Sequence, residues 1–339
     1  MSRVFITASR DTSIYEVFPN INAGYDEIIE VGKHKDDLGD TNGIVRSLQY
    51  YDVSDLMGAP TSSQIVLSLG VANAEKLNQN EFVYVYPMSS SWDEGSGYYN
   101  QTPYVSSDGA TWRRYATGSF WVASGSDFNV TPVVSASLDN LSNDRFRIDV
   151  TDVVRPMISG SSPSTNFGLL MKFANGSESD NDNEGTVKFF SRNTHTIHEP
   201  VLELLWDAQT ISAGTLKALV NFDIELAPNN LKSEYTKGEV FKLYFTVRDK
   251  YPQKVYTNTN RFDNKYYLPT ASNFSITDIG SGTTVIQFDD YSKVDADTNG
   301  SFITVDTTSL FKGRFYAIRL KVVLNTETYI SRTFEFKVS

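Results

Sequence analysis

The stretch "EFVYVYPMSSSWDEGSGYY", from Glu81 to Tyr99, contains the two features that decide the fold class. Its first eight residues place aliphatic and aromatic side chains on alternate positions, and this period of two is typical of a β-strand. The remaining residues hold a tryptophan, two carboxylates and two tyrosines in a glycine-broken run, which predicts a loop. The open question is whether Trp92, Asp93 and Glu94 bind a sugar or a metal there, or close one end of a β-sandwich.

The same alternation recurs along the chain, in "VFITAS", "VLSLGVANAEKL", "FRIDVTDVV", "VKFFSR" and "PVLELLW". Between these runs lie clusters of Gly, Asn, Asp, Ser and Pro such as "NGSESDNDNEG", which favour turns. Many short strands separated by frequent turns predict an all-β sandwich or barrel. Helical patterns are brief: the best is "TDVVRPM", where Thr151 caps the first turn and Pro156 is expected to cut the helix short.

The composition excludes several classes of protein. At 339 residues the chain is long enough for two domains, and no apolar run reaches the roughly 18 residues of a membrane-spanning helix. The absence of cysteine excludes disulfides, thiolate metal sites and cysteine nucleophiles. A net charge of −11 repels a phosphate backbone, so nucleic acid is not an expected partner. The start, "MSRVFITASR", lacks a signal-peptide core, which predicts no export by the usual secretory route.

One domain boundary is expected near Asp207. The segment "AQTISAG", Ala208 to Gly214, is small and polar, which is the composition of a linker. The residues after it contain seven strand-like runs, from "TLKALVNFDIEL" to "TYISRTFEFKVS", and this number matches an immunoglobulin-like β-sandwich. The sequence thus predicts one domain over residues 1–207 and an immunoglobulin-like β-sandwich domain over residues 208–339.

Residues 1–207 resemble the DNRLRE-type (disaggregatase-related) domains. The matching pieces follow the order of that family: "IVRSLQYYDVSDL", "SQIVLSLGVANA", "VYVYPMSSSWDEGSG", "FRIDVTDVVRPM", "NFGLLMKF" and "FFSRNTHTIHEPVLELLW". Trp92, followed by Asp93 and Glu94, stands where the family carries a tryptophan followed by an acidic residue. The resemblance implies a jelly-roll β-sandwich similar to carbohydrate-binding modules, a fold that hosts binding modules and structural modules alike.

The C-terminal part, from "SNFSITDIGSG" to the closing "FEFKVS", looks like the C-terminal β-domains of tailed-bacteriophage virion structural proteins. Together with the lack of cysteine, signal peptide and catalytic motif, this resemblance implies a non-catalytic structural protein of a virion tail, neck or capsid, assembled in the host cytoplasm. Its expected partners are other virion proteins in a multimeric assembly. The alternative is a carbohydrate-binding adhesin module on a virion or cell surface, with a glycan as its partner.

Calcium is the one cofactor for which the sequence offers a candidate site. "DADTNGSFITVD" places Asp295, Asp297 and Asn299 at the first three ligand positions of an EF-hand loop, and Asp306 at the last. An EF-hand needs a helix on each side, whereas these flanks have the pattern of strands, and "TNG" favours a hairpin. The sequence therefore favours an acidic hairpin over a metal site.

Two weaker metal motifs have simpler interpretations. "SDNDNEG", Ser179 to Gly185, has alternating acidic residues but Ser191 in the place of the last ligand, so it is interpreted as a solvated turn. "HTIHE" places His195 and His198 three residues apart, whereas a zinc site of the metalloprotease type needs both histidines on one face of a helix. The sequence therefore predicts no zinc site.

No arrangement of residues predicts an enzyme. Asp93 and Glu94 are neighbours on an extended chain, so their side chains point to opposite sides and do not converge on a glycosidic bond. A nucleophile elbow, a phosphate loop and a nucleotide-binding glycine motif are all absent from the sequence. No catalytic residue is therefore expected.

Aromatic side chains are the best candidates for recognition. In the first domain those in or beside loops are suited to stacking on sugar rings, with burial in the core as the alternative. They are Tyr98, Tyr99, Tyr104, Trp112, Tyr115 and Trp121. In the second domain the tyrosine-rich segment from Lys250 to Leu268 is expected either to dock a partner or to pack on its own domain. Its candidate contacts include Tyr256, Tyr266 and Tyr267.

Overall fold

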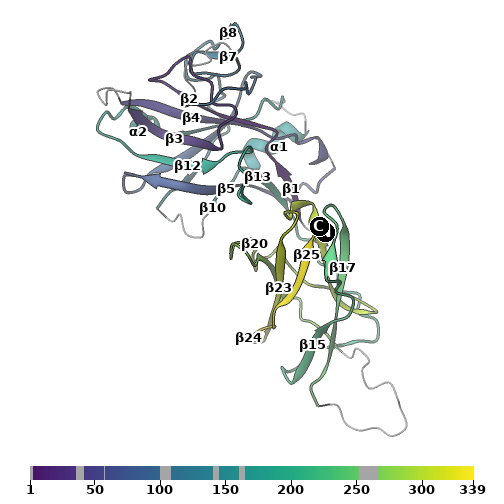
Figure 1. The fold of residues 1–339 in the computed structure, drawn as a ribbon. Coiled ribbons are helices and arrows are strands. Elements are labelled where there is room, and N and C mark those ends of the chain that lie inside the picture. Colours follow the sequence, from purple (N-terminus) through teal and green to yellow (C-terminus); the bar gives the residue numbers. More distant parts are fainter. Residues whose placement is uncertain are drawn as a thin grey trace. The chain divides into compact units, whose positions relative to one another are not determined.

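Figure 1 shows the computed structural model of the chain, which describes residues 3–35, 42–56, 58–99, 108–139, 145–159, 165–251 and 266–339. Nearly all of its regular structure is β, which confirms the all-β class. The chain divides into two compact units, Phe5–Leu205 (the N-terminal unit) and Trp206–Ser339 together with Met1–Val4 (the C-terminal unit). Within these described ranges no helix has the length and apolar character needed to cross a membrane.

The strands up to Leu205 form one extended sheet system with a small separate hairpin. The strands are β1 (Arg3–Thr7), β2 (Arg10–Tyr15), β3 (Ile28–Lys35), β4 (Asn42–Tyr50), β5 (Gln64–Glu75), β6 (Phe82–Pro87), β9 (Val134–Ser137), β10 (Arg145–Asp149), β11 (Leu169–Phe173), β12 (Thr186–Phe190) and β13 (Val201–Leu205), with the hairpin β7 (Arg114–Ala116) and β8 (Ser119–Phe120). The helical elements are η1 (Ser54–Leu56), α1 (Thr151–Ser159) and α2 (Asn175–Ser179). The strand predicted from "EFVYVYPM" is β6.

Strand β5 connects the two layers of the N-terminal unit. The strand order is β1-β13-β5-β12-β3-β4-β11-β6-β9, with β10 also on β5 and β2 also on β4. The first part of β5, up to Gly70, pairs with β10 and β13, whereas its last part, from Val71 on, pairs with β12. A Cβ at Gly70 would lie 2.3 Å from the Cβ of His198, so only glycine fits where β5 passes from one layer to the other.

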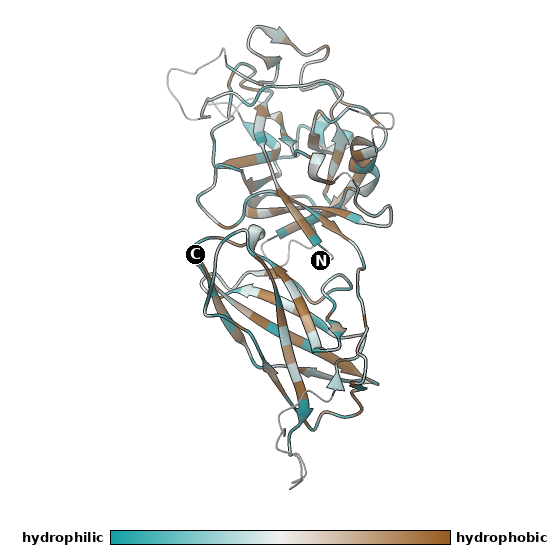
Figure 2. Cartoon of the chain, turned by 90° about the vertical axis from the view of Figure 1, so that its right-hand side faces the viewer, coloured by the Kyte–Doolittle hydropathy of each residue, from teal (hydrophilic) through white to brown (hydrophobic). Residues whose placement is uncertain are grey.

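Both faces of strand β4 are buried, which is why its alternation is incomplete in the sequence. Figure 2 shows the change between hydrophilic and hydrophobic residues along the strands. Val45 lies in a buried cluster on one face of β4, and Leu48 packs with Ile14 and Leu170 in a second cluster on the other. The second cluster is covered by residues 88–99 and 108–133, which are named here the β6–β9 segment.

Helix α1 continues past Pro156 to Ser159, so the prediction that this proline cuts the helix short is wrong. Pro156 lies just after the first turn, where it removes one hydrogen bond of the helix, to the carbonyl of Asp152. The helix retains its buried face across the proline, and this packing offsets the lost bond. The buried residues are Val153, Val154 and Met157.

The C-terminal unit contains two main sheets. Its strands are β14 (Lys217–Ala218), β15 (Ile224–Pro228), β16 (Glu234–Tyr235), β17 (Val240–Asp249), β18 (Tyr266–Tyr267), β19 (Asn273–Asp278), β20 (Thr284–Ile286), β21 (Asp295–Asp297), β22 (Gly300–Asp306), β23 (Phe315–Leu324), β24 (Glu327–Ile330) and β25 (Phe334–Val338), with η2 at Thr307–Ser309. One sheet has the order β15-β17-β22-β21, and the other β16-β25-β23-β19-β20 with β24 on β23. β16 runs parallel to β25, and β14 parallel to β18.

The segment "AQTISAG" is part of the C-terminal unit and not a free linker. The N–H of Thr210 donates to Oδ1 of Asp295 at 2.8 Å, and the N–H of Ala296 donates to the carbonyl of Thr210 at 3.0 Å. Ser212 N–H donates in turn to the carbonyl of Ala296 at 2.8 Å. Its small side chains gave the composition of a linker, but backbone hydrogen bonds, which composition does not reveal, fix it along β21.

Candidate functional site

The sequence left open whether Trp92 binds a ligand or has a structural role, and in the structure Trp92 is a core residue. It is 1% exposed, and its indole Nε1–H donates to the carbonyl of Phe167 at 3.0 Å. Its ring packs in the cluster formed by Ile14, Leu48 and Leu170 on the sheet. Trp92 therefore fastens the β6–β9 segment to the face of the sheet and does not offer its ring to a ligand.

Trp112 and Trp121 belong to the same cluster and Tyr115 packs against it, which is the burial in the core that the sequence left as the alternative to a sugar platform. Trp112 is 7% and Trp121 5% exposed, and the indole Nε1–H of Trp121 donates to the carbonyl of Thr111 at 2.9 Å. Tyr115 is half-buried with its ring centroid 5.6 Å from that of Trp121. A segment as long as the β6–β9 segment needs apolar side chains of its own to hold it on the sheet, and these aromatic residues supply them.

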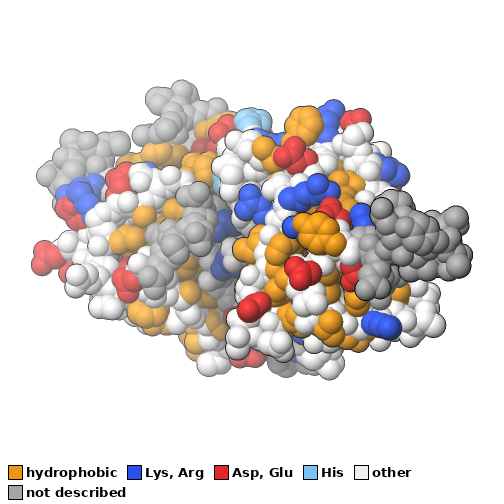
Figure 3. Space-filling model, turned by 90° about the horizontal axis from the view of Figure 1, so that it is seen from below, with side chains coloured by type: hydrophobic (Ala, Val, Ile, Leu, Met, Phe, Trp, Pro, Cys, Tyr) orange, Lys and Arg blue, Asp and Glu red, His pale blue; other side chains and the backbone are white. Residues whose placement is uncertain are grey.

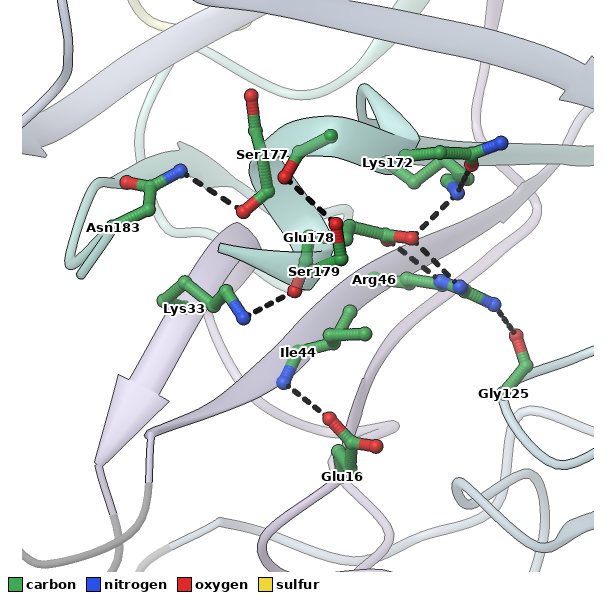
Figure 4. Close-up of polar contacts among 12 residues, drawn as sticks. Glu16, Lys33, Ile44, Arg46, Gly125, Lys172, Ser177, Glu178, Ser179 and Asn183 are labelled. Carbon is green, nitrogen blue, oxygen red and sulfur yellow. Dashed lines mark hydrogen bonds and ion pairs between the residues drawn. The ribbon is translucent and has the colours of Figure 1, made fainter. Parts of the chain in front are cut away.

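A buried charge cluster of Arg46, Lys172 and Glu178 holds α2 against the face of the sheet that carries the Trp92 cluster (Figure 4). The guanidinium of Arg46 binds both carboxylate oxygens of Glu178, at 2.9 and 2.8 Å, and the ammonium of Lys172 lies 2.5 Å from one of them. Arg46 also donates to the carbonyl of Gly125 at 2.6 Å, within the β6–β9 segment. One buried carboxylate thus holds two cations, and the cluster joins β4, β11 and α2 to the covering segment.

A second polar cluster surrounds Asp11, whose side chain is 1% exposed. Its Oδ2 accepts from Arg192 N–H at 2.7 Å, and its Oδ1 has no hydrogen-bond partner. Burial, partly opposed by the Arg192 hydrogen bond and assisted by the charge of Glu94, raises the pKa of Asp11 to about 8. The Glu94 carboxylate accepts from Asp11 N–H at 2.8 Å and from Arg192 Nη1 at 2.7 Å, whereas Asp93 is exposed. Glu94 is therefore engaged in an ion pair, away from Asp93.

An exposed pair of tyrosines lies beside these buried clusters. Tyr25 is 45% and Tyr98 48% exposed, and their ring centroids are 5.9 Å apart with the planes at 71°. Among the described members of the aromatic set that the sequence suggested, Tyr98 is the exposed one, and Tyr25 was missed. Tyr25 lies in "NINAGYD", which reads as a turn cluster, and nothing in one sequence indicates that two distant turns meet.

Asn22 holds the two tyrosine-bearing loops together. It is 1% exposed, and its Oδ1 accepts from Gly24 N–H at 3.2 Å and from Gly97 N–H at 2.8 Å. Tyr25 N–H donates to the carbonyl of Gly97 at 2.9 Å. A Cβ at Gly97 would lie 2.4 Å from the carbonyl oxygen of Asn22, so the loops approach too closely for any other residue. The tyrosine pair therefore stands on a fixed support.

A carboxylate and an imidazole meet close to Tyr25 in the chain. The Glu27 carboxylate lies 3.7 Å from Nε2 of His195, and both side chains are exposed. Asn193 Nδ2 donates to the carbonyl of Gly24 at 2.9 Å, and this bond joins the loop before β13 to the loop that carries Tyr25. Tyr25, Tyr98, Glu27 and His195 are named here the loop patch. The ring of His198 stacks on Phe190.

Tyr99 is turned inward, in contrast to its neighbour Tyr98. It is half-buried, its ring centroid lies 4.7 Å from that of Tyr15, and its hydroxyl is 2.7 Å from Nε2 of His34. Its N–H donates to the carboxylate of Asp26, at 3.1 and 3.2 Å, and burial raises the pKa of Asp26 to about 6. Tyr99 therefore contributes to the support of the loop patch and not to its surface. Tyr104 lies outside the described residues.

The EF-hand-like residues occupy the predicted hairpin, formed by β21 and β22. Asp297 Oδ1 accepts from Asn299 N–H at 2.7 Å and its Oδ2 from the hydroxyl of Tyr244 at 2.8 Å. Asp295 accepts from Thr210, and Asp306, at the far end of β22, caps η2 by accepting from Thr308 N–H. Each carboxylate has its own hydrogen-bond partner, and the described part of the chain holds no group of three or more acidic, His or Cys residues arranged for a metal.

The acidic stretch "SDNDNEG" begins at Ser179, the last residue of α2, and its other residues form the turn that follows. Asp182 N–H donates to Oδ1 of Asp180 at 2.9 Å, within the turn. Glu184 pairs with Lys35 and Lys76, and hydrogen bonds from these two ammonium groups lower the pKa of Glu184 to about 2. These carboxylates are thus used within the turn and in surface ion pairs.

The tyrosines of the second domain are only partly described. Tyr256 lies outside the described residues, as does most of the segment from Lys250 to Leu268. Tyr266 and Tyr267 form β18 and are half-buried, and the Tyr266 hydroxyl donates to Oδ1 of Asp249 at 2.9 Å. Tyr266 therefore packs on its own unit.

A hollow in the C-terminal unit combines apolar and charged groups. Its rim includes the exposed side chains of Ile279 and Phe315, 44% and 55% exposed. Within it Asp278 is fully buried, Arg314 lies 3.4 Å from its carboxylate, and Glu335 completes the lining. These residues, with Gly280 and Gly313, are named here the β19–β23 hollow. Figure 3 shows one face of the molecule, where hydrophobic side chains are exposed among Lys, Arg, Asp and Glu.

Comparison with known proteins does not place the chain in a family. No known protein family and no curated protein matches it, so the resemblance to DNRLRE-type domains gains no support. Among solved structures, the adhesin domain of Epf from Streptococcus pyogenes is 10% identical over 100% of this chain and 98% of that chain, with a TM-score of 0.18. The N-terminal domain of the Streptococcus gordonii adhesin Sgo0707 is 10% identical over 87% of this chain and 59% of that chain, with a TM-score of 0.13. TM-scores this low carry no argument about fold or function.

Proposed function

We propose that the chain is a non-catalytic binding protein built from a jelly roll and an immunoglobulin-like β-sandwich. In the N-terminal unit, β4, β11, β6 and β9 are neighbours in one layer, and β1, β13, β5 and β10 in the other. Strands that follow one another in the chain, such as β4, β5 and β6, therefore alternate between layers. This interleaving is the pattern of a jelly roll and supports that assignment.

Strand order also supports the immunoglobulin-like assignment of the C-terminal unit. The order β15-β17-β22-β21 corresponds to strands A, B, E and D of such a fold, and β25-β23-β19 to G, F and C. Tyr316 lies at the start of β23, and its buried hydroxyl accepts from Phe311 N–H at 2.7 Å. A tyrosine bonded to the backbone just upstream, at the corner between strands E and F, is the tyrosine corner of immunoglobulin-like domains.

The loop patch is the proposed binding site, and its ligand is a neutral saccharide. The observation that carries this proposal is the exposure of Tyr25 and Tyr98 on loops held rigid by the buried Asn22. Aromatic faces bind the apolar faces of sugar rings, and the neighbouring Glu27 and His195 offer hydrogen bonds to hydroxyls. A net charge of −11 disfavours acidic glycans. On this proposal the protein is an adhesin module of a virion or cell surface.

A glycan array with the full chain tests the loop patch. We expect reproducible binding to neutral saccharides, lost in Tyr25→Ala and in Tyr98→Ala. The matched control is Tyr251→Ala, because Tyr251 is an 81% exposed tyrosine of the C-terminal unit. Binding that survives both loop substitutions, or an array without any signal, contradicts the proposal. Circular dichroism of each variant separates loss of the site from loss of the fold.

We propose assembly with other copies or with virion proteins in the host cytoplasm as a second candidate function, and the β19–β23 hollow supports only its protein–protein contact. Exposed Ile279 and Phe315 beside the Asp278–Arg314 pair have the mixed character of a protein–protein contact. If the protein assembles through this hollow, light scattering of the full chain detects a multimer that Phe315→Lys dissociates. Phe120→Lys, at a 61% exposed phenylalanine of the N-terminal unit, is the control. A monomer at all concentrations contradicts self-assembly.

A further inference from the structure

Lys172, Asn175 and Glu178 form a compact chemical group around one buried amine, and Figure 4 shows Lys172 beside Glu178. Lys172 lies near the end of β11, Asn175 is the first residue of α2, and Glu178 lies one turn further on. The Lys172 Nζ donates to Oδ1 of Asn175 at 2.6 Å and lies 2.5 Å from Oε2 of Glu178. The amine of Lys172 is thus within hydrogen-bond distance of both a carboxamide and a carboxylate.

We propose that Lys172 and Asn175 join through an intramolecular isopeptide bond, with Glu178 carrying the proton. The side-chain amine is the nucleophile and the side-chain amide of Asn175 is the electrophile. Because both groups are held together by the fold, the reaction avoids the entropic cost of bringing two molecules into contact. The product is a covalent link between β11 and α2.

The surroundings favour the neutral amine that this reaction needs. Arg46 binds both oxygens of Glu178, so its permanent charge already balances the carboxylate that Lys172 shares. Burial lowers the pKa of Lys172, and hydrogen bonding to Glu178 only partly opposes this, while the charge of Arg46 adds to the lowering. A desolvated lysine beside a second cation is an activated nucleophile.

Burial also restricts which electrophile the amine reaches. The side chain of Lys172 is 3% exposed, and its ammonium lies 5.9 Å from the Phe128 ring centroid, under the β6–β9 segment. External electrophiles are therefore excluded. Asn175 is exposed, so the group that leaves from its amide has a path to solvent.

The step balances without any oxidant or cofactor. The lone pair of Lys172 Nζ attacks the side-chain carbonyl carbon of Asn175 and forms a C–N bond. Glu178 accepts the proton from Nζ and delivers it to the departing amide nitrogen, whose C–N bond breaks, and one ammonia is released. The Glu178 carboxylate is regenerated.

A competing reaction of Asn175 must be distinguished. Gly176 follows it, and the surroundings of Gly176 are open, with no atom within 4 Å of a Cβ placed there. Attack by the Gly176 backbone nitrogen would form a succinimide, which also loses one ammonia. Mass alone does not separate the two products, but the fate of Lys172 does, because only the isopeptide consumes its amine.

Mass spectrometry of the full chain tests the proposal. We expect an intact mass lower than the sequence mass by one ammonia, no tryptic cleavage after Lys172, and fragment ions that join Lys172 to Asn175. The loss should vanish in Lys172→Arg and in Asn175→Ala. It should persist in Lys33→Arg, because Lys33 is a second buried lysine whose ammonium donates to the backbone carbonyl of Glu178. An unchanged intact mass, or an ammonia loss that remains in Lys172→Arg, overturns the proposal.

Discussion

Asp11 makes the stability of the N-terminal unit depend on pH. Its folded pKa of about 8 lies far above the value near 4 of an aspartate in an unfolded chain. Between these values the folded chain keeps a proton that the unfolded chain has released. The free energy of unfolding therefore falls as pH rises through this window, and the loss is complete above the folded pKa.

The variant Asp11→Asn should remove the part of this pH dependence above about pH 6, since an amide carries no charge to bury and Asp26, with a pKa of about 6, contributes only at lower pH. We expect denaturant unfolding of the natural protein to show lower stability at about pH 8 than at about pH 5, with about 1.4 kcal/mol for each unit of pKa shift. The exposed Asp93→Asn serves as the control and should keep the natural slope. An equal slope in Asp11→Asn and the natural protein would show that another group titrates.

Trp92 tests whether the β6–β9 segment is held by its aromatic anchors. Trp92→Ala should lower the free energy of unfolding by about 3–5 kcal/mol, because it empties a buried site next to Leu48 and Leu170. Denaturant unfolding measures the loss. Tyr98→Ala, a half-exposed position in the same segment, should change stability by less than about 0.5 kcal/mol. Full stability in Trp92→Ala would refute a structural role for this side chain.

At the scale of the element, Tyr316 secures the turn between β22 and β23. Its hydroxyl accepts from Phe311 N–H, and Tyr316 is 1% exposed, so Tyr316→Phe leaves the N–H of the half-buried Phe311 without this partner. We expect a loss of about 1–3 kcal/mol. Native-state hydrogen exchange of the β22 and β23 amides measures it. Tyr251→Phe, at an exposed tyrosine, should leave these amides unchanged, and unchanged protection in Tyr316→Phe would contradict the assignment.

The strands were predictable from the sequence because alternation is a local property. β6, β10 and β13 lie within runs whose period of two places one side of each strand in a core, and the β21–β22 hairpin follows from "TNG". The same reasoning failed for Trp112 and Trp121. Their neighbours in sequence are loop residues, and only the three-dimensional fold reveals that this loop lies on a sheet.

The candidate site was less predictable than the fold, because it depends on contacts between distant turns. Tyr98 was identified, but Tyr25 and the buried Asn22 come from a turn more than 70 residues earlier in the chain. Asn and Gly in a turn have many local uses, so their type does not indicate a long-range support. The Lys172–Glu178 pair was likewise missed, because "NGSESDNDNEG" has the composition of a solvated turn and not of a helix with a buried glutamate.

At the scale of the whole molecule, each unit should fold alone. Each has its own set of buried apolar side chains, with Leu48 and Phe189 in the N-terminal unit and Leu243 and Phe336 in the C-terminal unit. We expect fragments 1–207 and 208–339 both to give cooperative thermal unfolding by circular dichroism.

The fragment 208–339 should be less stable than the same unit in the full chain. It lacks Arg3, which is 6% exposed and pairs with Asp289 in the C-terminal unit. An added Asp289→Asn substitution should recover part of that loss, since it removes the unpaired charge. A fragment 208–339 without a cooperative transition would contradict independent folding.

Tension is the condition under which the parallel pairing of β16 with β25 matters most. The N–H groups of Lys337 and Ser339 donate to the carbonyls of Ser233 and Tyr235, each at 2.9 Å, and Lys237 N–H donates back to Ser339 at 3.0 Å. If β16 and β25 are pulled in opposite directions along their common axis, these parallel strands are forced to slide past each other. The three bonds are then loaded together in shear instead of opening one after another. A C-terminal unit that carries load through these two strands would thus resist a steady pull until the three hydrogen bonds break. The force at which they break would be the force that the unit withstands.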